Sequence, residues 1–311
     1  MITIEEIKSL IVGPIATVPT PFDDEFEVDY GKMHELTQMW VDEGLVKGRA
    51  VLKVAAAMGE GPMLRDDEWP YLLRTVVQAA NDKAAIVCGL HYKDTKRTIE
   101  DAKRAQDMGA HALQVCPPVF NMPSQDDIFD YFAELSEAID IGIMVYHTHW
   151  LSGGRIEVDT ILRMKELKQI ASIKWSAPED VEHSEMSKFA DAFSVIANGY
   201  AIEAHKLGGR GYINVTASAY PAHDLKVWDL LESGNYEEAD KLFTSTDDAL
   251  RDFGAKMDAR SGGQARLPKA LMDVMGFNVG PSRPPSKPIN ANELAELKDI
   301  VKNQLGWPVP N

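Results

Sequence analysis

A single lysine interrupts an apolar, β-branched stretch of the sequence. Residues 170–175 read IASIKW, and Lys174 is the one charged residue among them. Removing an unpaired ammonium group from water costs several kcal/mol, so a lysine in a buried strand needs a reason. Burial disfavours the cation and raises the fraction of neutral amine, a nucleophile that forms a Schiff base with a ketone or aldehyde. The structural alternative is a lysine that reaches solvent at the strand end or pairs with a carboxylate.

Tyr146 ends the preceding apolar segment, IGIMVYH (141–147). If the two segments are neighbouring parallel strands in similar register, the phenol and the amine lie at the same height. A phenol in that place can carry protons to and from a carbinolamine and a leaving oxygen. Taken alone, Tyr146 is equally consistent with a half-buried aromatic ring whose hydroxyl binds the backbone.

Eight short apolar segments alternate with amphipathic, helix-like ones. The apolar segments are 13–22, 49–55, 84–90, 112–118, 141–147, 170–175, 193–199 and 211–217. Near-continuous apolar runs of this kind are typical of parallel strands that helices cover. The pattern predicts an α/β fold, a (β/α)8 TIM barrel, with a doubly wound sheet as the alternative.

The pattern after residue 220 is helical only. We therefore expect a barrel over residues 1–225 and a C-terminal helical extension over residues 226–311 that packs on it. In such a barrel the active site lies at the C-terminal ends of the strands, which is where Lys174 and Tyr146 fall. If Lys174 faces the barrel axis, strand alternation directs Ile173 and Trp175 towards the helices.

Composition limits the expected partners and location. The net charge of −16 and the pI near 4.9 argue against nucleic acid and anionic membranes as partners. The N-terminal segment lacks the features of a signal peptide, and no apolar run is long enough for a membrane span. Cys88 and Cys116 both lie in apolar runs, as buried, reduced cysteines do. We expect a soluble, cytoplasmic protein.

Six segments, in order, resemble the dihydrodipicolinate synthase / N-acetylneuraminate lyase family of class I aldolases. They are GPIATVPTPF (13–22), MGEGPMLRDDEW (58–69), NMPSQDDIFDYF (121–132), MVYHTHWLSGG (144–154), ASIKWSAPED (171–180) and PSRPPSKPI (281–289). The resemblance implies that Lys174 forms an imine with a 2-oxo acid, usually pyruvate or a pyruvoyl compound, and that Tyr146 carries protons. It implies no separate cofactor, because the imine forms on the lysine itself. It also implies a homo-oligomer, a tetramer or a dimer.

Several positions that the family uses to hold its substrate are changed here. The family's two threonines after the second strand are replaced by Ala57 and Met58, and the tyrosine that reaches a neighbouring subunit's site is replaced by Phe120. The arginine that the synthases carry five residues after the strand-five tyrosine is Leu151. A hydrogen bond to a carboxylate is worth about 1.5–3 kcal/mol, so losing several would weaken pyruvate binding. We therefore do not expect a typical dihydrodipicolinate synthase.

Other residues at the strand ends are candidates for contacting the substrate. The full set of expected contacts is Ala57, Met58, Phe120, His147, His149, Trp150, Asn198, Gly199 and Asn214. Histidines over a barrel mouth, including His91, can exchange protons near neutral pH. His147 and His149 could also ligate a metal, but no cysteine or carboxylate with ligand spacing accompanies them, so no metal is expected. Glu60 could act as a base, although we expect it to shape its loop.

The sequence thus predicts a Schiff-base lyase or aldolase that acts on a 2-oxo acid. The apolar character of Met58, Phe120 and Trp150 favours a bulky or aromatic aldehyde partner, as in the family's hydratase-aldolases for benzylidenepyruvates. A 2-oxo acid dehydratase or hydratase-aldolase would use the same imine. A barrel that has lost turnover and serves as a binding or regulatory protein is the alternative from another class. The retained Lys174 and Tyr146 argue against it.

Overall fold

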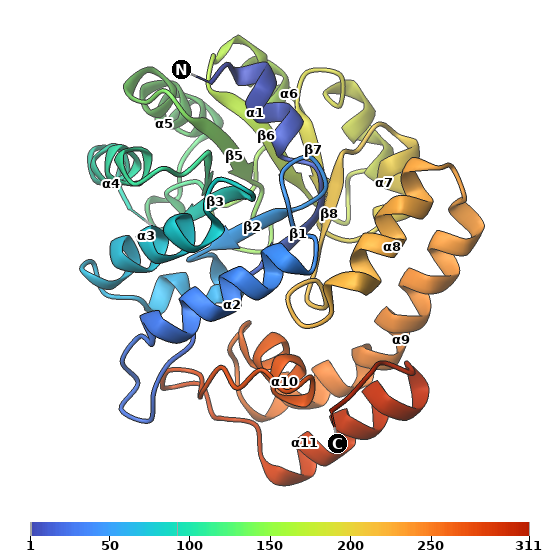
Figure 1. Ribbon diagram of the computed structural model, residues 1–311. Coiled ribbons are helices and arrows are strands. Elements are labelled where there is room, and N and C mark those ends of the chain that lie inside the picture. Colours follow the sequence, from blue (N-terminus) through green and yellow to red (C-terminus); the bar gives the residue numbers. More distant parts are fainter. Residues whose placement is uncertain (1, 92, 311) are drawn as a thin grey trace.

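The computed structural model describes residues 2–91 and 93–310 and forms a closed barrel of eight parallel strands surrounded by helices (Figure 1). Neighbouring strands follow the chain order, and β1 closes the barrel on β8. The strands are β1 (Gly13–Thr17), β2 (Val51–Val54), β3 (Ala85–Leu90), β4 (Ala112–Val115), β5 (Gly142–Tyr146), β6 (Ile170–Trp175), β7 (Ser194–Ala197) and β8 (Gly211–Asn214). The predicted (β/α)8 barrel is confirmed, and the doubly wound alternative is excluded.

Helices cover the outside of this barrel. They are α2 (Tyr30–Asp42), α3 (Glu68–Ala80), α4 (Thr95–Asp107), α5 (Gln125–Ala138), α6 (Val158–Arg163), α7 (Ala201–Lys206) and α8 (Pro221–Glu232). Three of them begin at a side chain that accepts a hydrogen bond from a backbone N–H of the first turn, namely Asp29, Asp94 and Ser124. These caps satisfy donors that the first turn of a helix leaves without a partner, which fixes where each helix begins.

The barrel interior is apolar at its lower end. Buried side chains from seven strands, β1 to β7, meet there, and helix α1 (Ile4–Leu10) closes the end with Ile7, followed by Ile11. A second apolar layer separates the strands from the helices and contains Ile173 and Trp175. Since these two residues face the helices, strand alternation turns Lys174 to the barrel axis, as the sequence predicts.

The C-terminal extension consists of α9 (Tyr236–Arg260), α10 (Arg266–Val274) and α11 (Ala291–Asp299), which lie together beside the barrel (Figure 1). The expected boundary between residues 225 and 226 falls inside α8. That helix follows β8 and packs against β1 as the last helix around the barrel, so the barrel continues to Glu232.

Within residues 2–91 and 93–310, no helix is both long and apolar enough to cross a membrane. Cys88 and Cys116 are both buried, as expected. The cytoplasmic location stays a prediction.

Candidate active site

Lys174 and Tyr146 are direct neighbours across β5 and β6. The two residues are paired in the strand register, and the Lys174 Nζ lies 3.8 Å from the centroid of the Tyr146 ring. Both side chains are buried at the C-terminal ends of their strands. The phenol and the amine therefore lie at the same height in the barrel, as the sequence predicts. A substrate attached to the Lys174 amine can exchange protons with the Tyr146 phenol.

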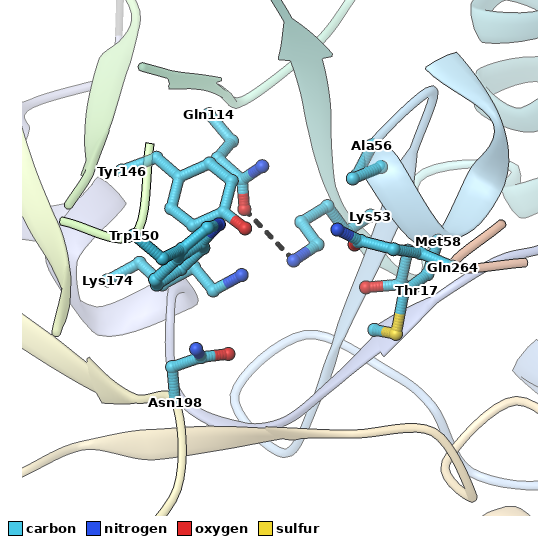
Figure 2. A pocket seen from close by; sticks show the side chains of 11 residues that line it. Thr17, Lys53, Ala56, Met58, Gln114, Tyr146, Trp150, Lys174, Asn198 and Gln264 are labelled. Atoms are coloured by element: carbon cyan, nitrogen blue, oxygen red, sulfur yellow. Dashed lines mark hydrogen bonds between the residues drawn. The ribbon is translucent and has the colours of Figure 1, made fainter. Parts of the chain in front are cut away.

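Both residues line a cavity of about 250 Å³ at the C-terminal end of the barrel (Figure 2). Its volume suits a small organic acid better than a large cofactor. The lining residues are Thr17, Lys53, Ala56, Ala57, Met58, Gln114, Tyr146, Trp150, Lys174, Asn198 and Gln264. Five of these were not expected from the sequence: Thr17, Lys53, Ala56, Gln114 and Gln264.

Lys53 is a second buried amine in this cavity. It comes from β2, is 1% exposed, and donates a hydrogen bond from its Nζ to the Gln114 Oε1 at 3.0 Å (Figure 2). Burial lowers the pKa of Lys53 to about 7. The sequence contains a signal that could have identified Lys53 as a site residue. Like Lys174, it is a lysine inside an apolar strand segment, RAVLKVA (49–55), where an unpaired charge needs a reason.

Two causes lower the pKa of Lys174 well below that of an ordinary lysine. The first is burial, and the second is the nearby positive charge of Lys53. Both disfavour the ammonium form. Lys174 is therefore poised as a neutral amine at a pH where a solvent-exposed lysine, with a pKa of about 10.4, is almost entirely protonated.

The other expected substrate contacts fall in three different places. Ala57, Met58, Trp150 and Asn198 line the cavity. Gly199 and Asn214 instead line an adjoining groove of about 500 Å³, between the ends of β7 and β8 and helix α9, which shares Met58 and Asn198 with the cavity. Phe120 lines neither, because its side chain is 93% exposed on the surface.

The histidines lie outside the cavity. His147 alternates with Tyr146 along the chain and faces the outer layer, where its ring stacks on Trp175 at 5.1 Å between ring centroids. Burial lowers the pKa of His147 to about 3 and that of His91, whose Nε2 lies 3.2 Å from the Ala55 oxygen, to about 4. His149 packs edge-on against Trp150. The expected contact of His147 and His149 with substrate is not supported by these positions.

The described part of the chain offers no support for the metal site that His147 and His149 could have formed. In the described ranges, no group of three or more histidine, cysteine, aspartate or glutamate side chains is arranged to hold a metal ion. Leu151 stands where the synthases carry an arginine, and the nearest arginine after it in the sequence is Arg155. This side chain forms ion pairs of 2.8 Å with Glu157 and Asp180. Arg155 does not line the cavity.

The C-terminal extension fixes the loop after β2, which supplies three cavity residues. Glu60 adopts a left-handed conformation (φ 58°) in this loop, accepts a hydrogen bond from the Arg283 N–H at 2.9 Å, and pairs with the Lys269 Nζ at 2.7 Å. Arg283 also binds both carboxylate oxygens of Glu68 at 2.7 Å. Glu60 points to the extension and does not line the cavity, in agreement with a loop-shaping role.

Replacing Arg283 by alanine should lower the free energy of unfolding by about 3 kcal/mol, because it leaves the buried Glu68 carboxylate without its bidentate partner. We place the effect at the lower end of the range for buried pairs, since Arg65 still faces Glu68 at 3.0 Å. Urea unfolding measures the change. The matched control is Arg49→Ala, whose ion pair with Asp229 is half exposed and should contribute at most about 1 kcal/mol. Equal effects of the two substitutions would contradict the structural role of Arg283.

The chain is similar in sequence to proteins of one known enzyme family. The sequence profile of the Dihydrodipicolinate synthetase family matches residues 11–304. A 4-hydroxy-tetrahydrodipicolinate synthase of Halalkalibacterium halodurans is 28% identical over 298 residues, which cover 94% of this chain and 98% of the relative.

Solved structures show the same fold. A putative dihydrodipicolinate synthetase from Pseudomonas aeruginosa superposes with a TM-score of 0.84 at 22% identity, covering 94% of this chain and 99% of that one. The dihydrodipicolinate synthase from Acinetobacter baumannii, solved in complex with pyruvate, gives a TM-score of 0.83 at 23% identity, covering 95% and 99%. The family resemblance stated from the six sequence segments is confirmed.

Proposed function

Because the chain belongs to the dihydrodipicolinate synthetase family, whose members are class I lyases and aldolases, we propose that it acts on a 2-oxo acid through a Schiff base on Lys174. The observation that carries this proposal is the placement of a buried amine beside a tyrosine in a small cavity at the barrel mouth. The lowered pKa of Lys174 supports it, since the neutral amine is the reactive form.

The proposed reaction begins when the Lys174 Nζ attacks the C2 carbonyl carbon of the acid. The resulting carbinolamine takes up a proton on its oxygen and loses water, which leaves a protonated imine. This imine accepts electrons from the bond that breaks at C3 and becomes an enamine. The bond is either a C–H bond, whose proton is taken up by a base, or a C–C bond to a carbinol carbon, which loses its hydroxyl proton and leaves as the aldehyde. Tyr146 lies beside the amine and is the group that we assign to carry these protons.

A bulky partner is the second part of the proposal. Part of the wall of the groove beside the cavity is apolar and comes from β8, its loop, α9 and α10: Ile213, Val215, Phe243, Leu250 and Leu267. The α9 side chains Asp247, Arg251 and Asp258 also line it. An apolar aldehyde, aromatic ones included, gains free energy by burying its surface there. Together with Ala57 and Met58 at the positions of the family's threonines, this favours an activity other than that of a typical dihydrodipicolinate synthase.

Dehydration or hydration of a 2-oxo acid would use the same imine and remains the alternative within the family. The non-catalytic binding protein gains no support from the cavity, because a binding site has no evident need for an amine with a lowered pKa. A homo-oligomer, a tetramer or a dimer, stays a prediction. The apolar side chains of Phe120 and Met122, 93% and 64% exposed, offer a surface that association would bury.

Deuterium exchange tests the proposed chemistry without knowledge of the aldehyde partner. In D2O the enzyme should exchange the C3 hydrogens of pyruvate, or of a larger 2-oxo acid, because the enamine picks up deuterium when it returns to the imine. Proton NMR follows the loss of the C3 signal. Exchange at the rate of buffer alone for every acid in the panel would contradict the proposal.

A further inference from the structure

Lys53 and Lys174 place two amines in one cavity without a negative charge to balance them. Lys53 is 1% exposed and Lys174 is 5% exposed. Among the residues that the structure describes, neither amine takes part in an ion pair, and the hydrogen bond of Lys53 goes to a neutral amide. The chain carries 48 acidic residues, yet none is placed here. The cavity therefore offers positive charge to whatever binds in it.

Lys269, a buried lysine outside the cavity, has the carboxylate partner that Lys53 lacks. Lys269 is also buried, and its Nζ pairs with the Glu60 carboxylate at 2.7 Å and donates to the Pro281 oxygen at 2.7 Å. This is the usual way to satisfy a buried ammonium group. Lys53 lacks such a partner, so an explanation in terms of stability alone fails for it.

The polar groups around Lys53 are suited to an anion. Figure 2 shows the Lys53 and Lys174 side chains entering the same space from different strands, with Thr17 and Gln114 beside them. The Thr17 hydroxyl and the Gln114 amide nitrogen are buried and have no hydrogen-bond partner in the structure. Both can donate, and the Lys53 ammonium has three N–H groups, of which the hydrogen bond to the Gln114 Oε1 uses one. The three side chains together therefore have donors to offer a bound anion.

The chemistry of a 2-oxo acid matches this arrangement. Its carboxylate is bonded directly to the carbonyl carbon, so an acid whose carbonyl is attached to Lys174 must place its carboxylate inside the same cavity of about 250 Å³. The family resemblance implies two threonines that help to hold that carboxylate; these positions are Ala57 and Met58 here and offer no side-chain donor.

We propose that Lys53 binds the carboxylate of the 2-oxo acid, with the Thr17 hydroxyl and the Gln114 amide as additional donors, and so takes over the role of the missing threonines. This inference rests on the proposed function of Lys174. The bound carboxylate supplies the counter-ion that Lys53 lacks and holds it in the ammonium form. Selection of acids over uncharged carbonyl compounds then depends on Lys53.

The test compares pyruvate with methyl pyruvate, which carries the same carbonyl but no charge. Borohydride reduction followed by intact-mass spectrometry gives the concentration of each compound that half-saturates the adduct. For Lys53→Met, the half-saturating concentration of pyruvate should rise at least tenfold relative to that of methyl pyruvate. The ratio of acid to ester is the readout, because a general disturbance of the cavity or of the Lys174 pKa affects both compounds. Lys298→Met, at an exposed lysine of α11, is the matched control and should leave the ratio unchanged.

Three results would overturn the inference, and they are distinguishable. If the wild-type protein forms an adduct on Lys174 but Lys53→Met keeps the wild-type ratio, Lys53 does not bind the carboxylate. If Lys53→Met does not fold, the wild-type ratio decides, and equal affinity for acid and ester contradicts the inference. If the wild-type protein forms no adduct on Lys174 with either compound, the proposed function fails as well.

Discussion

Replacing Lys174 by alanine should lower the rate of C3 exchange by on the order of 10³-fold or more, because the variant lacks the amine beside Tyr146 to which we assign the imine. Activity of the wild-type protein should persist at neutral pH, since the pKa of Lys174 is held well below its ordinary value by burial and by Lys53. The neutral amine is present above that pKa and lost below it, so activity should fall as the pH is lowered through it.

The Lys174→Ala protein should remain folded. Removing an amine that lacks an ion-pair partner leaves stability unchanged or increases it, so the urea midpoint should not fall. Lys298→Ala is the matched control for loss of a lysine at an exposed site and should retain full exchange. A folded Lys174→Ala protein that exchanges at the wild-type rate would show that Lys174 is not the nucleophile.

Replacing Tyr146 by phenylalanine should lower turnover by about 10²–10⁴-fold, the usual contribution of a positioned acid–base group. The ring contact with the Lys174 Nζ, at 3.8 Å from the ring centroid, is retained in the variant, so only the hydroxyl is lost. The imine should still form on Lys174, although more slowly. The rate of exchange and the yield of borohydride-trapped adduct, measured on the same sample, separate the two steps.

The control for this substitution is Tyr71→Phe, at a tyrosine of α3 that is 62% exposed and is not among the cavity-lining residues. It should leave exchange and trapping unchanged. If Tyr146→Phe also behaves as the wild-type protein, proton transfer passes through another group, and the hydroxyl of Tyr146 has no part in the chemistry.

The sequence predicted the barrel well because its signal is repeated along the chain. All eight apolar segments contain a strand, and the segment 170–175 coincides with β6. The segment 84–90 ends with β3 at Leu90, and the other six continue past their strands, because the apolar residues that follow, such as those after β1 and β8, pack in loops at the barrel mouth. Strand alternation then sufficed to turn Lys174 inward and Trp175 outward.

The candidate site was predicted less completely, since its residues come from different strands and only the closed barrel brings them together. His147 follows Tyr146 directly, so its side chain faces the opposite side of β5, towards Trp175. The prediction that His147 contacts substrate did not take this alternation into account. Lys53 was missed although it stands in an apolar strand as Lys174 does. Gln264 could not have been found, because it reaches the cavity from the extension, far away in the sequence.

The central claim is that Lys174 is the amine that becomes covalently attached to a 2-oxo acid. The most direct measurement is borohydride reduction in the presence of pyruvate and larger 2-oxo acids, followed by proteolysis and mass mapping of the modified peptide. The account predicts a single reduced adduct on Lys174 in the peptide that contains IASIKW. An adduct on Lys53 instead, or none on the folded protein with any acid of the panel, would contradict it.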